Sequence, residues 1–222
     1  MAKMEVSIKV ESPIHLSSGQ ADVTVDAEII HDELGFPYFP AKRFKGLLYE
    51  SAVEVLEMLE LSGLDKKNLP PLEKIFHRHS KSDVQLIMPN FYIMKLEKYR
   101  KFCAEWRYLQ KNNIFTAADV LKSYTSIRYQ TKLEKGVADK GSLRNLRVLD
   151  AGTEFFGTIT LLKDDDGILN LLALAIKNLT CAGLQRNRGF GKIKCTATFD
   201  GGETSETLVE KFFAEEAGTC TN

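Results

Sequence analysis

The chain has 222 residues, and its 30 lysines and arginines balance its 30 acidic residues, so overall charge indicates neither a nucleic-acid partner nor its absence. The length suffices for one domain with an insertion or for two small domains. No apolar run is long enough for a signal peptide or a membrane span, and the four cysteines lack both a C-x-x-C pair and a metal-like spacing. We therefore expect a cytoplasmic protein with reduced thiols and no membrane partner.

Charge is distributed unevenly along the chain. Residues Lys95–Arg147 include thirteen lysines and arginines and five acidic residues, whereas Asp200–Glu216 include six acidic residues and one lysine. This asymmetry predicts a basic working face and an acidic C-terminal tail.

The first half of the chain shows the periodicity of strands and helices. In order, we predict a half-buried strand at Met4–Val10, an extended run at Val23–Ile30, a turn at Asp32–Pro40, an amphipathic helix at Arg43–Leu61, a short helix at Leu72–His79 and a strand at Val84–Met94. Three basic residues, Lys42, Arg43 and Lys45, fall at the start of the long helix. Backbone N–H groups are unpaired there, so this end is a candidate phosphate site.

The second half begins with an irregular, basic region. Lys95–Gln110 mixes helix formers with aromatic residues; such residues beside lysines can stack bases, but their helical spacing favours Phe102 and Trp106 as core. Lys111–Asp150 is polar and basic and contains glycine, which predicts a hairpin or extended flap. The remaining predicted elements are a strand at Thr153–Leu162, an apolar helix at Ile168–Leu179, a strand at Lys192–Phe199 and a short helical patch that frays in the last twenty residues.

Apart from an extra extended run before the first helix, the order of these elements is βαββαβ with a long insertion in the middle. This order predicts an α+β chain with a ferredoxin-like core and an inserted hairpin region. We expect residues 1–94 to form the first part of the core, 95–150 the basic insertion, 151–200 the second part of the core and 201–222 an acidic tail.

The stretch Ala182–Lys194, AGLQRNRGFGKIK, joins the last predicted helix to the last strand and contains no acidic residue. Glycines permit positive φ, successive N–H groups in such loops form anion-binding concavities, and arginines offer forked donors to phosphate. The spacing matches neither the dinucleotide fingerprint nor a Walker motif. The alternatives are a glycine-rich turn with solvated charges and an anion-binding loop that uses Gly183, Arg186, Arg188, Gly189, Gly191 and Lys192.

Four segments taken together resemble the RAMP superfamily, the RNA-binding proteins of CRISPR systems. They are Ser12–Gly19, Asp26–Gly46, Gly136–Phe155 and Gly183–Gly191. The second segment resembles the backbone subunits of type III effectors, where it runs from a catalytic aspartate to a Lys-Gly at the start of the first helix. The chain departs from the family at Ala41–Phe44, where Gly-Ser-Ser is common, which puts the guide-RNA contacts of that turn in doubt.

The resemblance implies that the ferredoxin-like core is of the RNA-recognition type, that the inserted hairpin is a thumb, and that the residues named at the start of the long helix and in the glycine loop bind RNA. It also implies an antiviral effector subunit that assembles with copies of itself and other CRISPR subunits along a guide RNA, and whose thumb kinks the duplex with complementary target RNA. It further implies that Asp26, at the family's catalytic position, binds Mg²⁺ or Mn²⁺ and cuts target RNA. Chemically, one carboxylate can help hold a metal that activates an attacking oxygen and stabilises the leaving group. The alternative for Asp26 is a solvent-facing strand residue.

Three other functions stay open at this point. The chain could be a purely structural RNA-binding scaffold, or a standalone, metal-independent endoribonuclease that processes guide RNA by acid–base chemistry through His15 or His31. It could also be an adaptor whose glycine loop binds a nucleotide phosphate, although the missing Walker elements argue against this.

Overall fold

The computed structural model describes residues 2–64, 69–76, 86–162 and 165–219. The predicted short helix beyond Phe76 and the first two residues of the predicted strand at Val84–Met94 lie outside these residues. The chain has a mixed α/β fold in which all pairings between the named strands are antiparallel. Its main sheet contains β1 (Ala2–Val10), β2 (Tyr38–Phe39), β3 (Leu86–Ile87), β4 (Phe91–Tyr92), β9 (Glu154–Leu161) and β10 (Ile193–Phe199).

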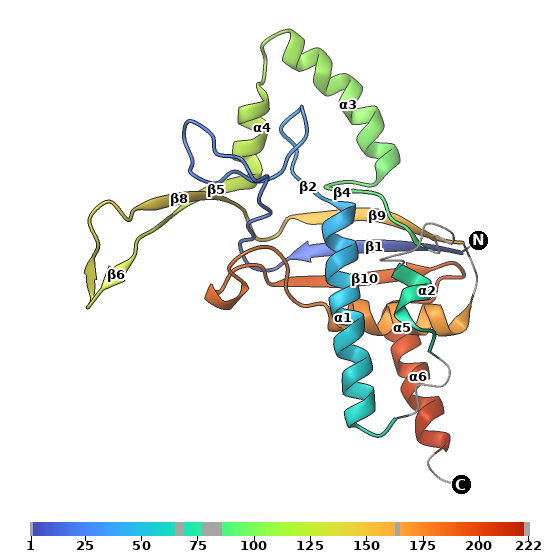
Figure 1. Cartoon of the computed structure of the whole chain (residues 1–222). Helices are drawn as coiled ribbons and strands as arrows, with labels where there is room; N and C mark the ends of the chain where they lie inside the picture. The colour runs from blue at the N-terminus through green and yellow to red at the C-terminus, as the bar shows by residue number, and fades with distance from the viewer. Residues whose placement is uncertain (1, 65–68, 77–85, 163–164, 220–222) are drawn as a thin grey trace.

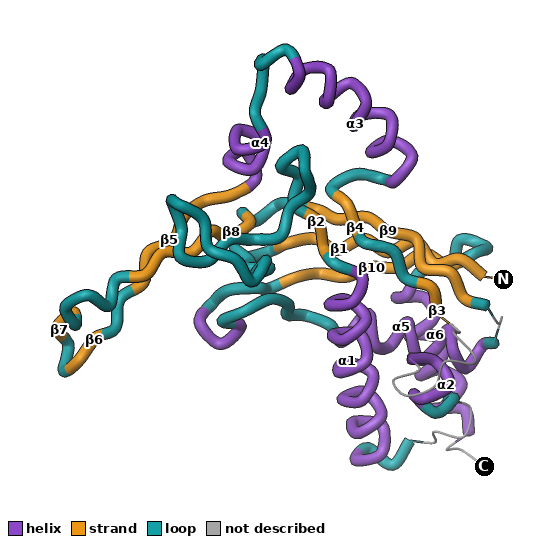
Figure 2. The backbone as a smooth tube through the Cα atoms, turned by 45° about the horizontal axis from the view of Figure 1, so that its top comes forward, coloured by secondary structure: helices purple, strands orange, loops and turns teal. Residues whose placement is uncertain are grey.

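The strands of the main sheet follow the order β10-β1-β9-β4-β2, and β3 also pairs with β9. The alternation predicted for β1 is confirmed, since Met4, Val6, Ile8 and Val10 are buried while Lys3, Glu5 and Lys9 are exposed. A strand with this period of two presents one apolar face, which must be covered. The helices that cover it are α1 (Ala41–Leu61), α2 (Leu72–Phe76), α5 (Asp166–Asn178) and α6 (Ser205–Thr219), which gather on one side of the molecule (Figures 1 and 2).

Helices α1 and α5 form the centre of this layer. The buried face of α1 includes Phe44, Leu48 and Ala52, at the spacing that the sequence predicts. Between the two helices, the Ser51 hydroxyl donates a hydrogen bond of 2.7 Å to the carbonyl oxygen of Ala175. The prediction of a short, fraying helical patch at the C-terminus is wrong. Helix α6 has 15 residues, and its Leu208 and Phe212 are buried.

The insertion contains α3 (Leu96–Lys111), α4 (Ala117–Tyr124), β5 (Thr125–Gln130), β6 (Leu133–Glu134), β7 (Val137–Ala138) and β8 (Arg144–Leu149). Strands β5 to β8 form the predicted hairpin, which projects from the body of the molecule (Figures 1 and 2). The polar composition of this region does not predict helix α4. Its signal is a capping box at Thr116 and Asp119, in which each side chain accepts from the other residue's backbone N–H.

Helix α3 packs on the Asp32–Pro40 turn through an aromatic cluster. The Phe36 ring lies 5.7–6.3 Å, between centroids, from the rings of Tyr99, Phe102, Trp106 and Tyr124. This packing confirms the interpretation of Phe102 and Trp106 as core. The Asp32 carboxylate holds the turn by accepting hydrogen bonds from the N–H groups of Leu34 (2.9 Å) and Phe36 (2.8 Å) and from the Tyr99 hydroxyl. Burial, together with this bond to Asp32, raises the pKa of Tyr99 well above its usual range.

The predicted extended run at Val23–Ile30 is wrong as a strand. Residues in this stretch form isolated bridges, Ser17 with Ile29 and Ala27 with Leu146, and Val23 is fully exposed whereas Glu28 is buried. The predicted alternation of buried apolar and exposed polar residues fails here. The acidic side chain of Glu28 occupies a buried position because it forms an ion pair with a cationic side chain in the interior.

Candidate nucleic-acid interface

The glycine loop is a closely packed backbone turn. Gly183 and Gly191 have φ of +80° and +79°, and a Cβ atom would lie 2.8 Å from the carbonyl oxygen of His15 at the first position and 2.0 Å from that of Ala182 at the second. Gly191 also donates its N–H to the carbonyl oxygen of Pro13 (2.9 Å). Glycine is therefore required at both positions by conformation and by space.

The two later glycines of the loop provide a matched test of this packing. Gly189→Ala is expected to cost about 1–2 kcal/mol, because its φ of +79° is unfavourable for a residue with a Cβ, but nothing lies within 4 Å of the added atom. Gly191→Ala is expected to cost clearly more, because the added Cβ overlaps the backbone of Ala182. Urea unfolding of the two variants measures the difference, and equal losses would contradict the close approach.

The backbone N–H groups of the loop are partly engaged within the protein. Those of Ala182, Leu184, Arg188, Gly191 and Ile193 donate to carbonyl oxygens, and that of Lys192 donates to the Ser12 hydroxyl, so the predicted concavity of free N–H groups is wrong at these six positions. The side chains of Arg186 and Arg188 are exposed and make no hydrogen bond or ion pair within the described part of the chain. Both arginines line a cavity of about 740 Å³ together with Gly183, Leu184 and Gln185. The loop can therefore offer two guanidinium groups to an anion.

A second cavity, of about 290 Å³, joins the glycine loop to the start of α1. Lys42 and Arg43 line one side of it, and Gly183 and Leu184, which also line the larger cavity, form another side. The Arg43 guanidinium donates a hydrogen bond to the carbonyl oxygen of Ser17. The structure thus brings together predicted residues that are about 140 positions apart in the sequence.

The other predicted cations of this region are placed differently. Lys45 is the fifth residue of α1, at the beginning of its second turn, and does not line the smaller cavity. Lys192 forms an ion pair with Glu11 at 3.0 Å, so its positive charge is already balanced within the protein. The first turn of α1 contains no acidic residue, as an anion site requires, although the N–H of Ala41 is already bonded to the side-chain oxygen of Asn90 (2.9 Å).

Asp26 is exposed and is held by Asn145 of β8. Its N–H donates to Asn145 Oδ1 (2.7 Å), and its Oδ2 accepts from the N–H of Asn145 (2.9 Å). The described residues contain no group of three or more histidine, cysteine, aspartate or glutamate side chains that could hold a metal. A lone exposed carboxylate does not make a complete protein site, but it fits Mg²⁺, which keeps several waters and commonly binds one or two carboxylates plus phosphates.

Beside Asp26 lies a buried ion pair that the sequence pattern does not reveal. The Arg147 Nε donates to both carboxylate oxygens of Glu28, at 2.9 and 3.0 Å, and the two side chains are 7% and 9% exposed. Arg147 is one of the cations of the predicted basic working face, but its side chain faces inward. No spacing rule links these residues, which are 119 positions apart.

The two candidate histidines differ in their surroundings. His15 is 2% exposed, and its Nδ1 lies 2.7 Å from the carbonyl oxygen of Arg147. His31 is exposed, with Nδ1 2.8 Å from the carbonyl oxygen of Asp32. The burial of His15 makes it a packing residue of the hairpin base, which argues against its use as an exposed acid or base.

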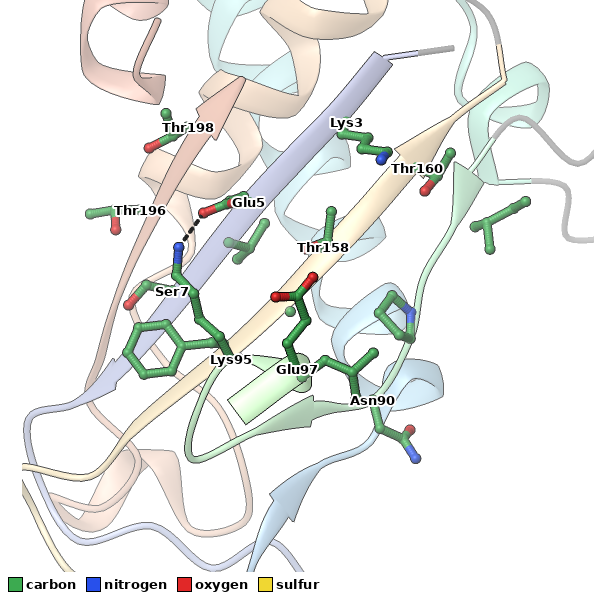
Figure 3. A pocket seen from close by; sticks show the side chains of 16 residues that line it. Lys3, Glu5, Ser7, Asn90, Lys95, Glu97, Thr158, Thr160, Thr196 and Thr198 are labelled. Carbon is green, nitrogen blue, oxygen red and sulfur yellow. Dashed lines mark hydrogen bonds and ion pairs between the residues drawn. The ribbon is translucent and has the colours of Figure 1, made fainter. Parts of the chain in front are cut away.

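A further cavity, of about 790 Å³, lies on the exposed face of the sheet, and Figure 3 shows its lining from β1, β9, β10 and the start of α3. Cations and anions are mixed here, and Lys95 pairs with Glu5 at 2.8 Å. None of the predicted RNA-binding residues lines this cavity. Its two lysines are matched by two glutamates, whereas the larger glycine-loop cavity is lined by two arginines and no acidic residue. The cavity at the α1 start has two cations and one acid, Glu50, so the glycine loop with the α1 start is the better candidate interface.

No curated protein matches the sequence. One similar solved structure is the type III-B Cmr-beta bound to cognate target RNA, with a TM-score of 0.60 and 12% sequence identity; the match covers 94% of this chain and 99% of that chain. Another is the type III-B Cmr-beta in the apo state, with a TM-score of 0.59 and 12% sequence identity; this match covers 87% of this chain and 96% of that chain. None of the helices among the described residues is long and apolar enough to span a membrane. The family model of the RAMP superfamily matches residues 7–194, and the chain therefore belongs to the RAMP superfamily.

Proposed function

We propose that this chain is an RNA-binding backbone subunit of a type III CRISPR effector complex, which assembles with copies of itself and other subunits along a guide RNA and binds paired target RNA. The observation that carries the proposal is the convergence of two cationic segments, Lys42–Arg43 and Arg186–Arg188, on cavities that share Gly183 and Leu184. Clustered cations beside an open cavity suit a polyanionic backbone. The description of one structural neighbour as bound to cognate target RNA agrees with this choice of ligand.

The core of this subunit is a ferredoxin-like unit with a thumb-like insertion at residues 95–150. The chain order β1, α1, β3 with β4, β9, α5 and β10, and the sheet order β10-β1-β9-β4, support a βαββαβ core. Exposed lysines and arginines on the projecting hairpin, such as Arg128, Lys135 and Arg144, suit contact with a guide–target duplex.

Asp26 gives the subunit a cleavage function that depends on Mg²⁺ or Mn²⁺. The bound metal would supply Lewis acidity and an activated oxygen at the target strand. The chain would hold the metal through one carboxylate, that of Asp26, which is bonded to Asn145, and RNA phosphate oxygens and water would have to supply the remaining ligands. A carboxylate beside an RNA backbone is otherwise repulsive, so its place here makes chemical sense with a cation.

The binding proposal is tested with the double variant Arg186→Ala/Arg188→Ala and a guide-like single-stranded RNA. We expect affinity to fall about 10-fold or more, because hydrogen bonds to charged groups contribute about 1.5–3 kcal/mol each. The slope of log K against log salt should also become shallower by about 0.7 for each lost phosphate contact. Filter binding at several salt concentrations measures both quantities.

A matched control removes the same charge elsewhere. Lys177→Ala/Lys211→Ala acts on α5 and α6, where each lysine is already paired with a glutamate, at Glu206 and Glu203. This control should keep the wild-type affinity and slope. Unchanged binding in the arginine double variant would overturn the proposal, and displacement of the RNA by ATP would favour the nucleotide-binding adaptor instead.

A further inference from the structure

The base of the inserted hairpin is bonded along its edge to the loop that carries Asp26. Strand β8 pairs with β5 on one side, and residues 24–28 occupy its other side. Asn145 Nδ2 donates to the carbonyl oxygen of Thr24 (3.1 Å), and the N–H of Arg147 donates to that of Ala27 (3.0 Å). Together with the two hydrogen bonds between Asp26 and Asn145, these contacts connect the loop to three successive residues of β8, namely Asn145, Leu146 and Arg147.

We propose that Asn145 is a positioning residue that fixes Asp26 to the hairpin, so that the carboxylate and the hairpin take up their positions on RNA as one unit. The idea rests on the proposed cleavage function, because it specifies how the carboxylate of that site is oriented. The side-chain amide suits this role because its oxygen accepts the Asp26 N–H while its nitrogen donates to Thr24. Both ends of a single planar group therefore hold the turn around Asp26.

The buried ion pair of Glu28 and Arg147 prevents the loop from shifting its register along β8. Glu28 also accepts the N–H of Ile29 (2.8 Å), and Arg147 reaches the Thr125 hydroxyl at 3.4 Å on the paired strand β5. A buried, hydrogen-bonded ion pair fixes register, since any shift would leave a charge without a partner. Asn145 lies two residues from this anchor on the same edge, where it is half-buried beside the exposed Asp26.

The first test is amide hydrogen exchange in the full chain without RNA. In Asn145→Ala, the Asp26 N–H loses its acceptor, and its exchange should become roughly 2- to 12-fold faster, the effect of one net hydrogen bond. Asn145→Asp keeps that acceptor oxygen and should retain slow exchange at Asp26. The matched control is Asn112→Ala, which removes an exposed amide that donates to the carbonyl oxygen of Tyr108 (2.8 Å) and should change nothing at Asp26.

The second test separates positioning from binding in the assembled complex with guide and target RNA. Asn145→Ala should lower the cutting rate at saturating target by about 10- to 100-fold, as expected for groups that orient a metal ligand, while target affinity stays at the wild-type value. Unchanged Asp26 exchange in Asn145→Ala would overturn the proposal, and so would faster exchange with a wild-type cutting rate. If the wild type cuts with neither Mg²⁺ nor Mn²⁺, the cleavage function fails, and the exchange data alone decide whether Asn145 fixes Asp26.

Discussion

Asp26→Asn is expected to abolish metal-dependent cutting of target RNA while leaving RNA binding nearly intact. The substitution preserves size and the acceptor for the Asn145 N–H, but removes the negative charge that would hold a divalent cation. A metal acting as a Lewis acid contributes several kcal/mol to transition-state stabilisation, so we expect a loss of about 100-fold or more in the cutting rate. The measurement is cleavage of labelled target RNA in the assembled complex, with Mg²⁺, with Mn²⁺ and with EDTA.

The same loop supplies the control for this experiment. Asp22 is also exposed, and its carboxylate accepts the N–H of Val23 (2.7 Å) without contact to the hairpin. Asp22→Asn should therefore cut at the wild-type rate. If Asp26→Asn retains wild-type cutting, the carboxylate has no catalytic part and the chain is a scaffold; if cutting survives EDTA, acid–base chemistry such as that considered for His31 must explain it.

The elements that the sequence predicts best are those whose burial follows a single regular period. The strand at Met4–Val10 and the helix at Arg43–Leu61 each pack one face on the same core, so local pattern and final environment agree. The glycine loop could also be located, because positive φ and close backbone approach exclude other residues at Gly183 and Gly191. The predicted concavity of free N–H groups could not be tested from the sequence, because it depends on tertiary partners: six N–H groups of the loop are already bonded within the protein.

The contacts around Asp26 could not be predicted because their partners come from the distant insertion. Alternation from Val23 suggests a strand, but the final environment of Glu28 is set by Arg147, which lies 119 residues later. Asn145 has no periodic signal at all, and its role follows from the register of β8 against the loop. Helix α4 differs, since its capping residues Thr116 and Asp119 are visible in the sequence but are outweighed by the polar composition.

Loss of one partner of the buried ion pair of Glu28 and Arg147 is expected to destabilise the fold strongly. Glu28→Gln keeps the volume but leaves the Arg147 guanidinium buried without its counter-charge, which typically costs about 3–5 kcal/mol. In a chain of this size such a loss lowers the melting temperature by roughly 6–20 °C. Thermal unfolding followed by circular dichroism measures it. The matched control is Glu206→Gln on α6, whose partner Lys177 is half exposed, and its melting temperature should hardly change.

The double variant Glu28→Met/Arg147→Met separates the cost of an unpaired charge from the value of the pair itself. Replacing both members of a buried pair by apolar side chains of similar size is often neutral, so the double variant should melt well above Glu28→Gln. Its loop would still lack the charge-based register, since two methionines pack in several arrangements. If the double variant melts at the same temperature as Glu28→Gln, the unpaired charge is not the main cost. The loss of stability would then come from the hydrogen bonds that the pair makes with Ile29 and Thr125. If the double variant recovers the melting temperature but its Asp26 N–H exchanges faster than in the wild type, the ion pair orients the loop and is not needed for stability.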